Sequence, residues 1–118
     1  KLAERYHRKL SELPVLTQKL PHSVYSAYHL FVINFKKEEH IHQRQAIFNH
    51  LREAGIGVNV HYIPVHTHPH FKSIGYNWGD FPASEAYYQS AISLPMFPDL
   101  THEEQDYVIE QLKLSMHV

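Results

Sequence analysis

Residues 27–35, AYHLFVINF, are the stretch that most restricts how this chain can fold. Its aromatic and β-branched side chains favour a β-strand over a helix. Both alternating faces of such a strand are mostly apolar, so both faces must be covered by other parts of the chain. We therefore predict a strand near the middle of a sheet, with the remaining elements arranged around it.

The segments around this strand are mainly helical in pattern. Apolar residues recur at helical spacing or follow helix-start signals in four segments, which are residues 1–13, 40–54, 82–90 and 102–114. Two further segments are extended: residues 58–63 alternate like a strand, and the prolines within residues 93–98 exclude a helix there. This order predicts an α+β domain, with a small two- or three-stranded sheet and helices packed on one side.

The intervening segments are predicted to be irregular. Residues 14–26 contain two prolines and several polar residues and are expected to be a connector. Residues 66–81 are expected to be a loop with a short turn of helix at residues 71–74. No internal repeat is visible, so we expect a single domain.

Individual residues mark where the helices begin and end. Gly55 follows the second helical segment, where a left-handed residue commonly ends a helix. Asp80 is positioned to cap the helix that Pro82 enters. Thr101 and Glu104 have the spacing of a capping box at the start of the last helix.

The first helix has no such start signal. Lys1 already lies within its apolar pattern, and no Ser, Thr, Asp or Asn precedes it. We therefore expect residues 1–118 to be part of a longer protein, with residues 1–13 forming the end of a helix that continues from an upstream domain.

Composition excludes several classes of function. The chain has no cysteine, so disulfide frameworks, thiolate metal sites and cysteine nucleophiles are excluded. Eleven basic residues nearly balance twelve acidic ones, which argues against nucleic acid as a partner. No apolar run has the ~18 residues that a membrane span needs, and no signal peptide is visible, so a cytoplasmic protein is expected.

Histidine is the unusual residue, with 12 in the chain, and four of these lie within residues 61–70. His66, His68 and His70 alternate along a predicted loop and could place three imidazole nitrogens on one side. One hypothesis is therefore a freestanding metal-binding module. However, no carboxylate lies close by, and the alternative is that these histidines are ordinary hydrogen-bonding loop residues.

Three segments resemble one known family. These are G-I-x-x-x-x-H-Y-x-P-x-H at residues 55–66, G-D-F-P-x-x-E at residues 79–85, and S-L-P-x-x-P-x-L-T-x-E-E at residues 93–104. In this order and spacing they are similar to the C-terminal small domain of the DegT/DnrJ/EryC/StrS sugar aminotransferases. Within that family, the resemblance is strongest to the aminotransferases of pseudaminic-acid biosynthesis, a type often named for spore-coat polysaccharide biosynthesis.

The resemblance implies a pyridoxal-phosphate enzyme of fold type I that acts as a homodimer. Such an enzyme would transfer an amino group from glutamate to carbon 4 of a UDP-linked 4-keto-6-deoxy sugar. In the family, the Schiff-base lysine and the other cofactor-binding residues belong to a large N-terminal domain, which this sequence lacks. None of the seven lysines here lies in the family's lysine motif, so we expect no catalytic or cofactor-binding residue in the chain, and no transaminase activity from it alone.

The same resemblance directs attention to the end of the predicted strand at residues 58–63. We expect His61, Tyr62 and His66 to bind the nucleotide-sugar, because polar groups at a strand end can orient sugar or diphosphate oxygens. Tyr62 shares a face with Val58, so packing in the core is the alternative role for its ring. For Asp80 and Glu85, helix capping and a local ion pair are simpler explanations than substrate contact.

Overall fold

The computed structural model of the chain describes residues 1–117. A three-stranded antiparallel sheet lies in the middle, in the order β1 (Val15–Thr17), β2 (Phe31–Phe35) and β3 (Ala91–Leu94). Val15 pairs with Phe35, and Phe31 pairs with Leu94. The prediction of a central strand is confirmed, since β2 pairs on both sides, but the strand begins at Phe31 rather than at residue 27.

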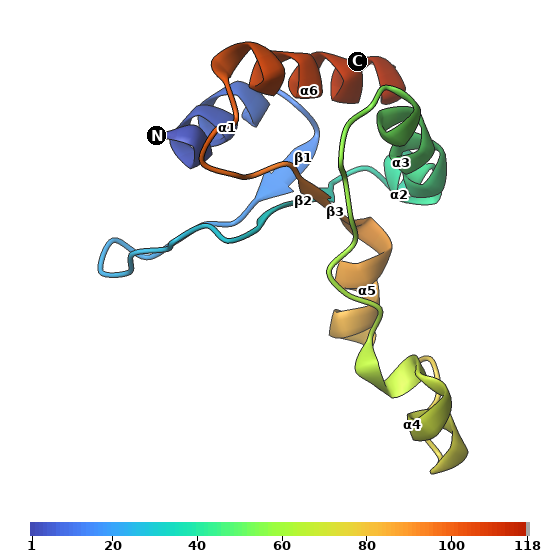
Figure 1. The fold of residues 1–118 in the computed structure, drawn as a ribbon. Helices are drawn as coiled ribbons and strands as arrows, with labels where there is room; N and C mark the ends of the chain where they lie inside the picture. Colours follow the sequence, from blue (N-terminus) through green and yellow to red (C-terminus); the bar gives the residue numbers. More distant parts are fainter. Residues whose placement is uncertain (118) are drawn as a thin grey trace.

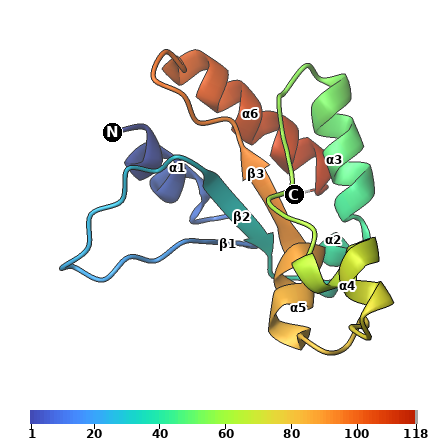
Figure 2. The same cartoon turned by 60° about the horizontal axis from the view of Figure 1, so that its bottom comes forward.

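Helices α1 (Leu2–Leu10), α3 (Arg44–Glu53) and α6 (His102–Ser115) cover one face of the sheet, as Figures 1 and 2 show. The core forms between this face and these helices, where Tyr6, Ile33, Leu51, Ile92 and Leu112 are 0% exposed. The α+β class is therefore as predicted, and three helices cover one side of the sheet, whereas α5 (Pro82–Ser90) contacts β2 through Asn34, which alternates with the core-facing Ile33 and Phe35. Burial of this apolar cluster supplies the main driving force for folding.

The first two helical segments differ in detail from their predictions. The first helix ends at Leu10 rather than at residue 13, and the chain turns before Pro14. The segment predicted as one helix over residues 40–54 is two helices, α2 (Glu38–His42) and α3, separated at Gln43. Gly55 ends α3 with φ +79°, and the bonds from its N–H to the Arg52 carbonyl and from the Ile56 N–H to the Leu51 carbonyl form a Schellman motif.

Two predictions about strands were wrong. The connector over residues 14–26 contains β1, where Val15 is buried and Leu16 is exposed. This strand is only three residues long, which is too short for its alternation to be recognised. Residues 58–63 do not form a strand. Only Asn59 pairs with Ser93, because the chain runs beside β3 for one bridge and then leaves the sheet.

Two segments project from the body of the molecule (Figure 1). Residues 18–30 form a long loop between β1 and β2. Residues 62–84, which we call the arm, contain the 3-10 helix η1 (Val65–Thr67), the short helix α4 (Pro69–Ser73) and the first residues of α5 (Pro82–Ser90). The short helix predicted at residues 71–74 is thus present as Pro69–Ser73, and α5 has its predicted bounds.

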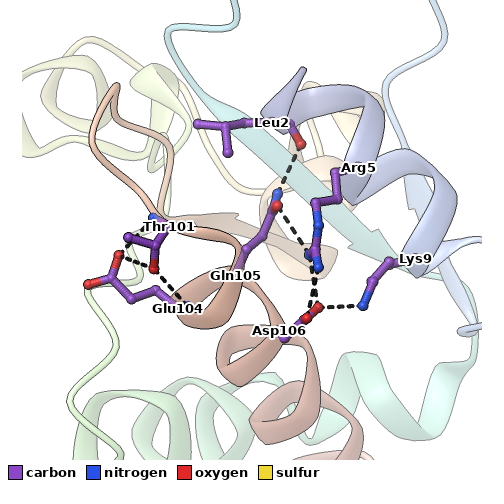
Figure 3. Close-up of polar contacts among 7 residues, drawn as sticks. All are labelled: Leu2, Arg5, Lys9, Thr101, Glu104, Gln105 and Asp106. Carbon is purple, nitrogen blue, oxygen red and sulfur yellow. Dashed lines mark hydrogen bonds and ion pairs between the residues drawn. The ribbon is translucent and has the colours of Figure 1, made fainter.

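Polar contacts fix α1 against α6, as Figure 3 shows. The Arg5 guanidinium donates to both carboxylate oxygens of Asp106, at 2.8 and 2.7 Å, and Lys9 pairs with the same carboxylate. The buried Gln105 amide donates to the Leu2 carbonyl at 2.9 Å. At the start of α6, Thr101 and Glu104 form the predicted capping box. Within residues 1–117, no helix is long and apolar enough to cross a membrane.

Candidate functional site

His61 lies where the extended segment after α3 leaves β3. The Asn59–Ser93 bridge fixes the backbone two residues earlier, through N–H to carbonyl bonds of 3.2 and 2.8 Å. The Nδ1 atom of His61 is then 2.7 Å from the Ser93 Oγ, and Ser93 is 4% exposed. This hydrogen bond fixes the imidazole orientation and leaves Nε2 free for another partner.

A groove of about 550 Å³ adjoins this histidine. Its lining comes from the Gly55–Asn59 segment, the Pro95–Leu100 loop and the first turns of α6, and includes His61, Ser93, Glu104 and Tyr107. The groove combines apolar walls with a few polar groups and has the size of a small-molecule site. If the Ser93 hydroxyl donates to Nδ1, the Nε2 of His61 carries a proton and can donate to a ligand oxygen.

Tyr62 is next to His61 but outside the core. Its side chain is 71% exposed, so the alternative of a core position is wrong. Its ring packs edge-on against the His61 ring, with 4.7 Å between centroids. The alternation that suggested a shared face with Val58 ends when the chain leaves β3 after Asn59. The half-buried His61 and the exposed Tyr62 thus form one pair of rings at the end of the sheet.

His66 lies in a different environment, within η1 of the arm. It is 7% exposed, and its Nε2 is 2.7 Å from the Oε1 of Glu85, which is 4% exposed. Glu85 also accepts hydrogen bonds from the N–H groups of Gly79 at 2.7 Å and Phe81 at 3.4 Å. Burial raises the pKa of the Glu85 carboxyl, but the hydrogen bonds from Gly79, His66 and Phe81 outweigh it and leave the pKa below its usual value.

Glu85 has the local partner that was expected for it, in the form of a hydrogen bond to the His66 imidazole, whereas the capping role expected for Asp80 is not present. No side chain caps α5, and its N-cap residue is Phe81. Asp80 instead accepts from the Asn77 N–H at 2.8 Å and closes its own turn. Glu85 lies one turn inside the helix and reaches back to the Phe81 N–H, so it takes the place of a cap.

The three alternating histidines do not converge. The Nε2 of His66 is bound to Glu85, whereas His68 and His70 are exposed at the start of α4. In the part of the chain that the structure describes, no three His, Asp or Glu side chains are grouped so that they could hold a metal ion. The geometry thus does not favour the metal-binding hypothesis.

A second cavity lies in the arm itself. It has a volume of about 350 Å³ and is lined by Val65, His66, Phe71, Tyr76, Phe81 and Ser84. The sequence-based interpretation did not anticipate it, because the aromatic residues are spread over a segment predicted to be a loop. The available signal in the sequence was the high density of aromatic residues near the G-D-F-P-x-x-E motif at residues 79–85. Ser93 was also missed, although a serine within the buried strand β3 marks a polar contact there.

None of the seven lysines has the environment of a Schiff-base lysine, which requires an amine desolvated in a pocket or beside another cation. Five are exposed, and Lys9 and Lys113 are half-buried on the surface of α1 and α6. Lys9 is paired with Asp106.

Comparison with known proteins identifies the group to which this structure is related. The model of the DegT/DnrJ/EryC1/StrS aminotransferase family matches residues 1–113. The chain belongs to this family. The predicted resemblance is therefore confirmed over nearly the whole chain.

Curated relatives include the spore coat polysaccharide biosynthesis protein SpsC of Bacillus subtilis, which is 34% identical over 115 residues. Another is the erythromycin biosynthesis sensory transduction protein EryC1 of Saccharopolyspora erythraea, which is 35% identical over 114 residues. In both comparisons the alignment covers 95% of this chain and 30% of the relative. The chain thus spans about a third of the length of the curated relatives that it matches.

Solved structures that match this chain also include sugar aminotransferases. The protein Spr1654 of Streptococcus pneumoniae, assigned as a sugar aminotransferase, was solved in forms with pyridoxal phosphate and pyridoxamine phosphate. It matches with a TM-score of 0.90 and 27% identity, covering 98% of this chain and 29% of Spr1654 in its pyridoxamine-phosphate form. The aminotransferase PseC of Helicobacter pylori, involved in pseudaminic-acid biosynthesis, matches with a TM-score of 0.88 and 20% identity, which establishes the shared fold. Of that chain, 31% is covered.

Proposed function

We propose that this chain is the C-terminal small domain of a pyridoxal-phosphate-dependent nucleotide-sugar aminotransferase. The observation that carries the proposal is the family match over residues 1–113, together with coverage of only 30% of the curated relatives. The full protein would transfer an amino group from glutamate to carbon 4 of a UDP-4-keto-6-deoxy sugar, for surface polysaccharide or pseudaminic-acid biosynthesis. We propose that it acts in the cytoplasm as a homodimer.

The residues of this chain do not fit the cofactor itself. Its lysines are exposed or half-buried at the surface, so we infer that a large domain outside residues 1–118 binds pyridoxal phosphate. When bound, the cofactor supplies the electron sink for amino-group transfer. The chain by itself would therefore have no transaminase activity.

The contribution of this chain to the reaction would be substrate orientation. The His61 imidazole, fixed through Nδ1 by Ser93, presents Nε2 as one donor or acceptor to a sugar hydroxyl or diphosphate oxygen. Tyr62, 71% exposed and packed on the His61 ring, offers its phenol beside it. His66 would act differently from the other two, since its Nε2 is bound to Glu85, and would contribute the ring that lines the cavity of the arm.

The test uses the family-length protein, by which we mean a protein as long as the curated relatives that contains this chain. Capture of the native protein with an antibody against residues 1–118 is expected to give an intact mass about three times 13.9 kDa. That protein, incubated with glutamate and a UDP-4-keto-6-deoxy sugar, is expected to yield the 4-amino sugar and 2-oxoglutarate. A native mass near 13.9 kDa, or turnover by the chain alone that survives further purification, would overturn the proposal.

Two histidine variants of the family-length protein test the assigned contacts. His61→Ala is expected to raise KM for the nucleotide-sugar while leaving KM for glutamate unchanged, because its proposed contact is with the sugar nucleotide alone. His68→Ala is the matched control, because His68 is exposed on the arm and lines neither cavity. Equal effects of the two substitutions would remove His61 from the site.

A further inference from the structure

The cavity in the arm is built from aromatic rings. Three of its six lining residues are aromatic, namely Phe71, Tyr76 and Phe81, and the His66 ring lies beside them. The ring centroids of Phe71 and Tyr76 are 6.2 Å apart, those of Tyr76 and Phe81 are 6.0 Å apart, and those of His66 and Phe81 are 4.8 Å apart. The three pairs have interplanar angles of 39° to 63°, so the rings form the walls of a box rather than a closed stack.

The box is open, and two of its rings are partly exposed. Tyr76 is 41% exposed and Phe81 is 47% exposed, although both belong to residue types that gain most from leaving water. A volume of about 350 Å³ falls at the lower end of the range for small-molecule sites. A ligand that covered the exposed ring faces would gain favourable burial without displacing any protein contact.

Hydrogen bonds preform the walls. The Glu85 carboxylate accepts from His66, Gly79 and Phe81, and so joins η1, the arm and the start of α5. The Asp80 carboxylate accepts from the Asn77 N–H, and the Tyr76 N–H donates to the Phe71 carbonyl. Binding to a preformed cavity costs less ordering of side chains and loops than binding to a mobile one.

The lining is uncharged. None of its six residues is Lys, Arg, Asp or Glu, and the imidazole of His66 is already bonded to Glu85. A phosphate or carboxylate would find no cation there. Polar edges are nevertheless available in the Ser84 hydroxyl and the Tyr76 phenol. The cavity therefore suits a flat, neutral ring with hydrogen-bonding groups on its rim.

We propose that the cavity binds the base of the nucleotide-sugar, stacked on the exposed faces of Tyr76 and Phe81. The inference rests on the proposed function for the identity of the ligand. Every nucleobase has a flat face that stacks on aromatic side chains, and its rim carries the donors and acceptors that Ser84 and Tyr76 can meet. The charged diphosphate and the sugar remain outside the uncharged lining.

The experiment is a titration of the ¹⁵N-labelled chain with nucleosides, followed through amide chemical shifts. Uridine, thymidine and guanosine are the probes, and ribose 5-phosphate is the control that lacks a base. At least one nucleoside is expected to shift the amide signals of Gly79 and Phe81 saturably, whereas ribose 5-phosphate leaves them unchanged. Shifts caused equally by ribose 5-phosphate, or the absence of saturable shifts with all three nucleosides, would overturn the proposal.

Leucine variants test whether the rings carry the binding. Tyr76→Leu and Phe81→Leu keep apolar volume but remove the flat faces, so each is expected to weaken nucleoside binding at least about fivefold. Tyr25→Leu is the matched control, since Tyr25 is 94% exposed in the other projecting loop. Melting curves show whether each variant is folded, and unchanged binding by folded Tyr76→Leu and Phe81→Leu variants would refute the assignment.

The outcome also separates this proposal from the proposed function. Amino transfer by the family-length protein without nucleoside shifts at Gly79 and Phe81 would refute the base site alone. Saturable, ring-dependent nucleoside shifts without any amino transfer would refute the transaminase assignment and leave the base site standing. Self-association of the chain that Tyr76→Leu abolishes, without nucleoside binding, would show that a second copy fills the cavity instead.

Discussion

The hydroxyl of Tyr6 connects the core to the groove beside His61. Tyr6 is 0% exposed, and its phenol donates to the Pro95 carbonyl at 3.0 Å. Pro95 belongs to the loop that lines the groove. The Tyr6 ring also packs on Phe31 in the central strand, with 4.8 Å between centroids. Removing the hydroxyl while keeping the ring should therefore test how strongly α1 holds this loop.

Tyr6→Phe should destabilise the domain by a modest and calculable amount. The change removes one neutral hydrogen bond, which contributes about 0.5–1.5 kcal/mol to stability. Pro95 is half-buried, so we expect water to replace part of the lost bond. In a chain of this size about 1 kcal/mol corresponds to a fall of about 4 °C in Tm. Tyr6→Ala also deletes the ring and should cost a further ~3–5 kcal/mol.

Thermal unfolding followed by circular dichroism measures both effects. Tyr25→Phe is the control, because Tyr25 is 94% exposed and should lose its hydroxyl without consequence. A Tm for Tyr6→Phe that equals those of the native chain and Tyr25→Phe would show that the Tyr6–Pro95 bond contributes nothing. A fall as large as that of Tyr6→Ala would show that the ring packing was disturbed as well.

The same residue predicts a response to alkaline pH. Burial raises the pKa of the Tyr6 phenol well above its usual value of about 10. The unfolded chain therefore loses this proton first as the pH rises, and the contribution of Tyr6 to stability declines above pH ~10. The Tyr6→Phe variant has no such group, so its stability should fall less steeply with pH in this range. Equal slopes for the two proteins would contradict the assigned cause.

Three further predictions concern other parts of the molecule. Hydrogen bonds from Arg5 and Lys9 lower the pKa of Asp106, so the contribution of Asp106 to stability is present above pH ~4 and is lost as the pH falls further. The free energy of unfolding of an Asp106→Asn variant should therefore lack this part of the decrease when the pH is lowered. Gly55→Ala should cost about 1–2 kcal/mol in urea unfolding because Gly55 has φ +79°, whereas Gly57→Ala should be neutral or slightly stabilising. Prolonged dialysis against a chelator should leave Tm unchanged, since Glu85 occupies the Nε2 of His66; a fall in Tm that added zinc restores would revive the metal hypothesis.

Local signals predicted those parts of the fold that local interactions determine. The Thr101–Glu104 capping box and the Gly55 helix end depend on residues within one or two turns, and both are present as expected. The central position of β2 followed from its two apolar faces. The short strand β1 exists only because Val15–Thr17 pair with Ile33–Phe35, which lie 16 to 20 positions later, and no local pattern encodes such pairing.

In the candidate site, too, the sequence predicts the local features but not the contacts between distant residues. The sequence indicated His61, Tyr62 and His66, but it could not indicate their partners. Ser93 is 32 positions from His61, and Glu85 is 19 positions from His66, so the two histidines that looked equivalent in the sequence have different environments. The position of Tyr62, in the core or at the surface, could not be predicted, because the alternating pattern of residues 58–63 indicates a strand that does not form. The backbone makes only one bridge there, at Asn59, and that bridge decides the outcome.

This arrangement separates the residues that stabilise the domain from those proposed to bind substrate. The core is built from α1, α3, α6 and the sheet, whereas His61, Tyr62 and the aromatic box of the arm contribute no side chain to the core cluster. The two parts are connected at few points, among them the Asn59–Ser93 bridge and the packing of α5 on β2, where Asn34 donates to Ser90 at 2.9 Å. Substitutions in the arm are therefore expected to change its surface at little cost to the stability of the core. Segments that project from a stable scaffold can vary while the scaffold is kept, in agreement with the TM-score of 0.90 that this chain shares with Spr1654 at only 27% identity.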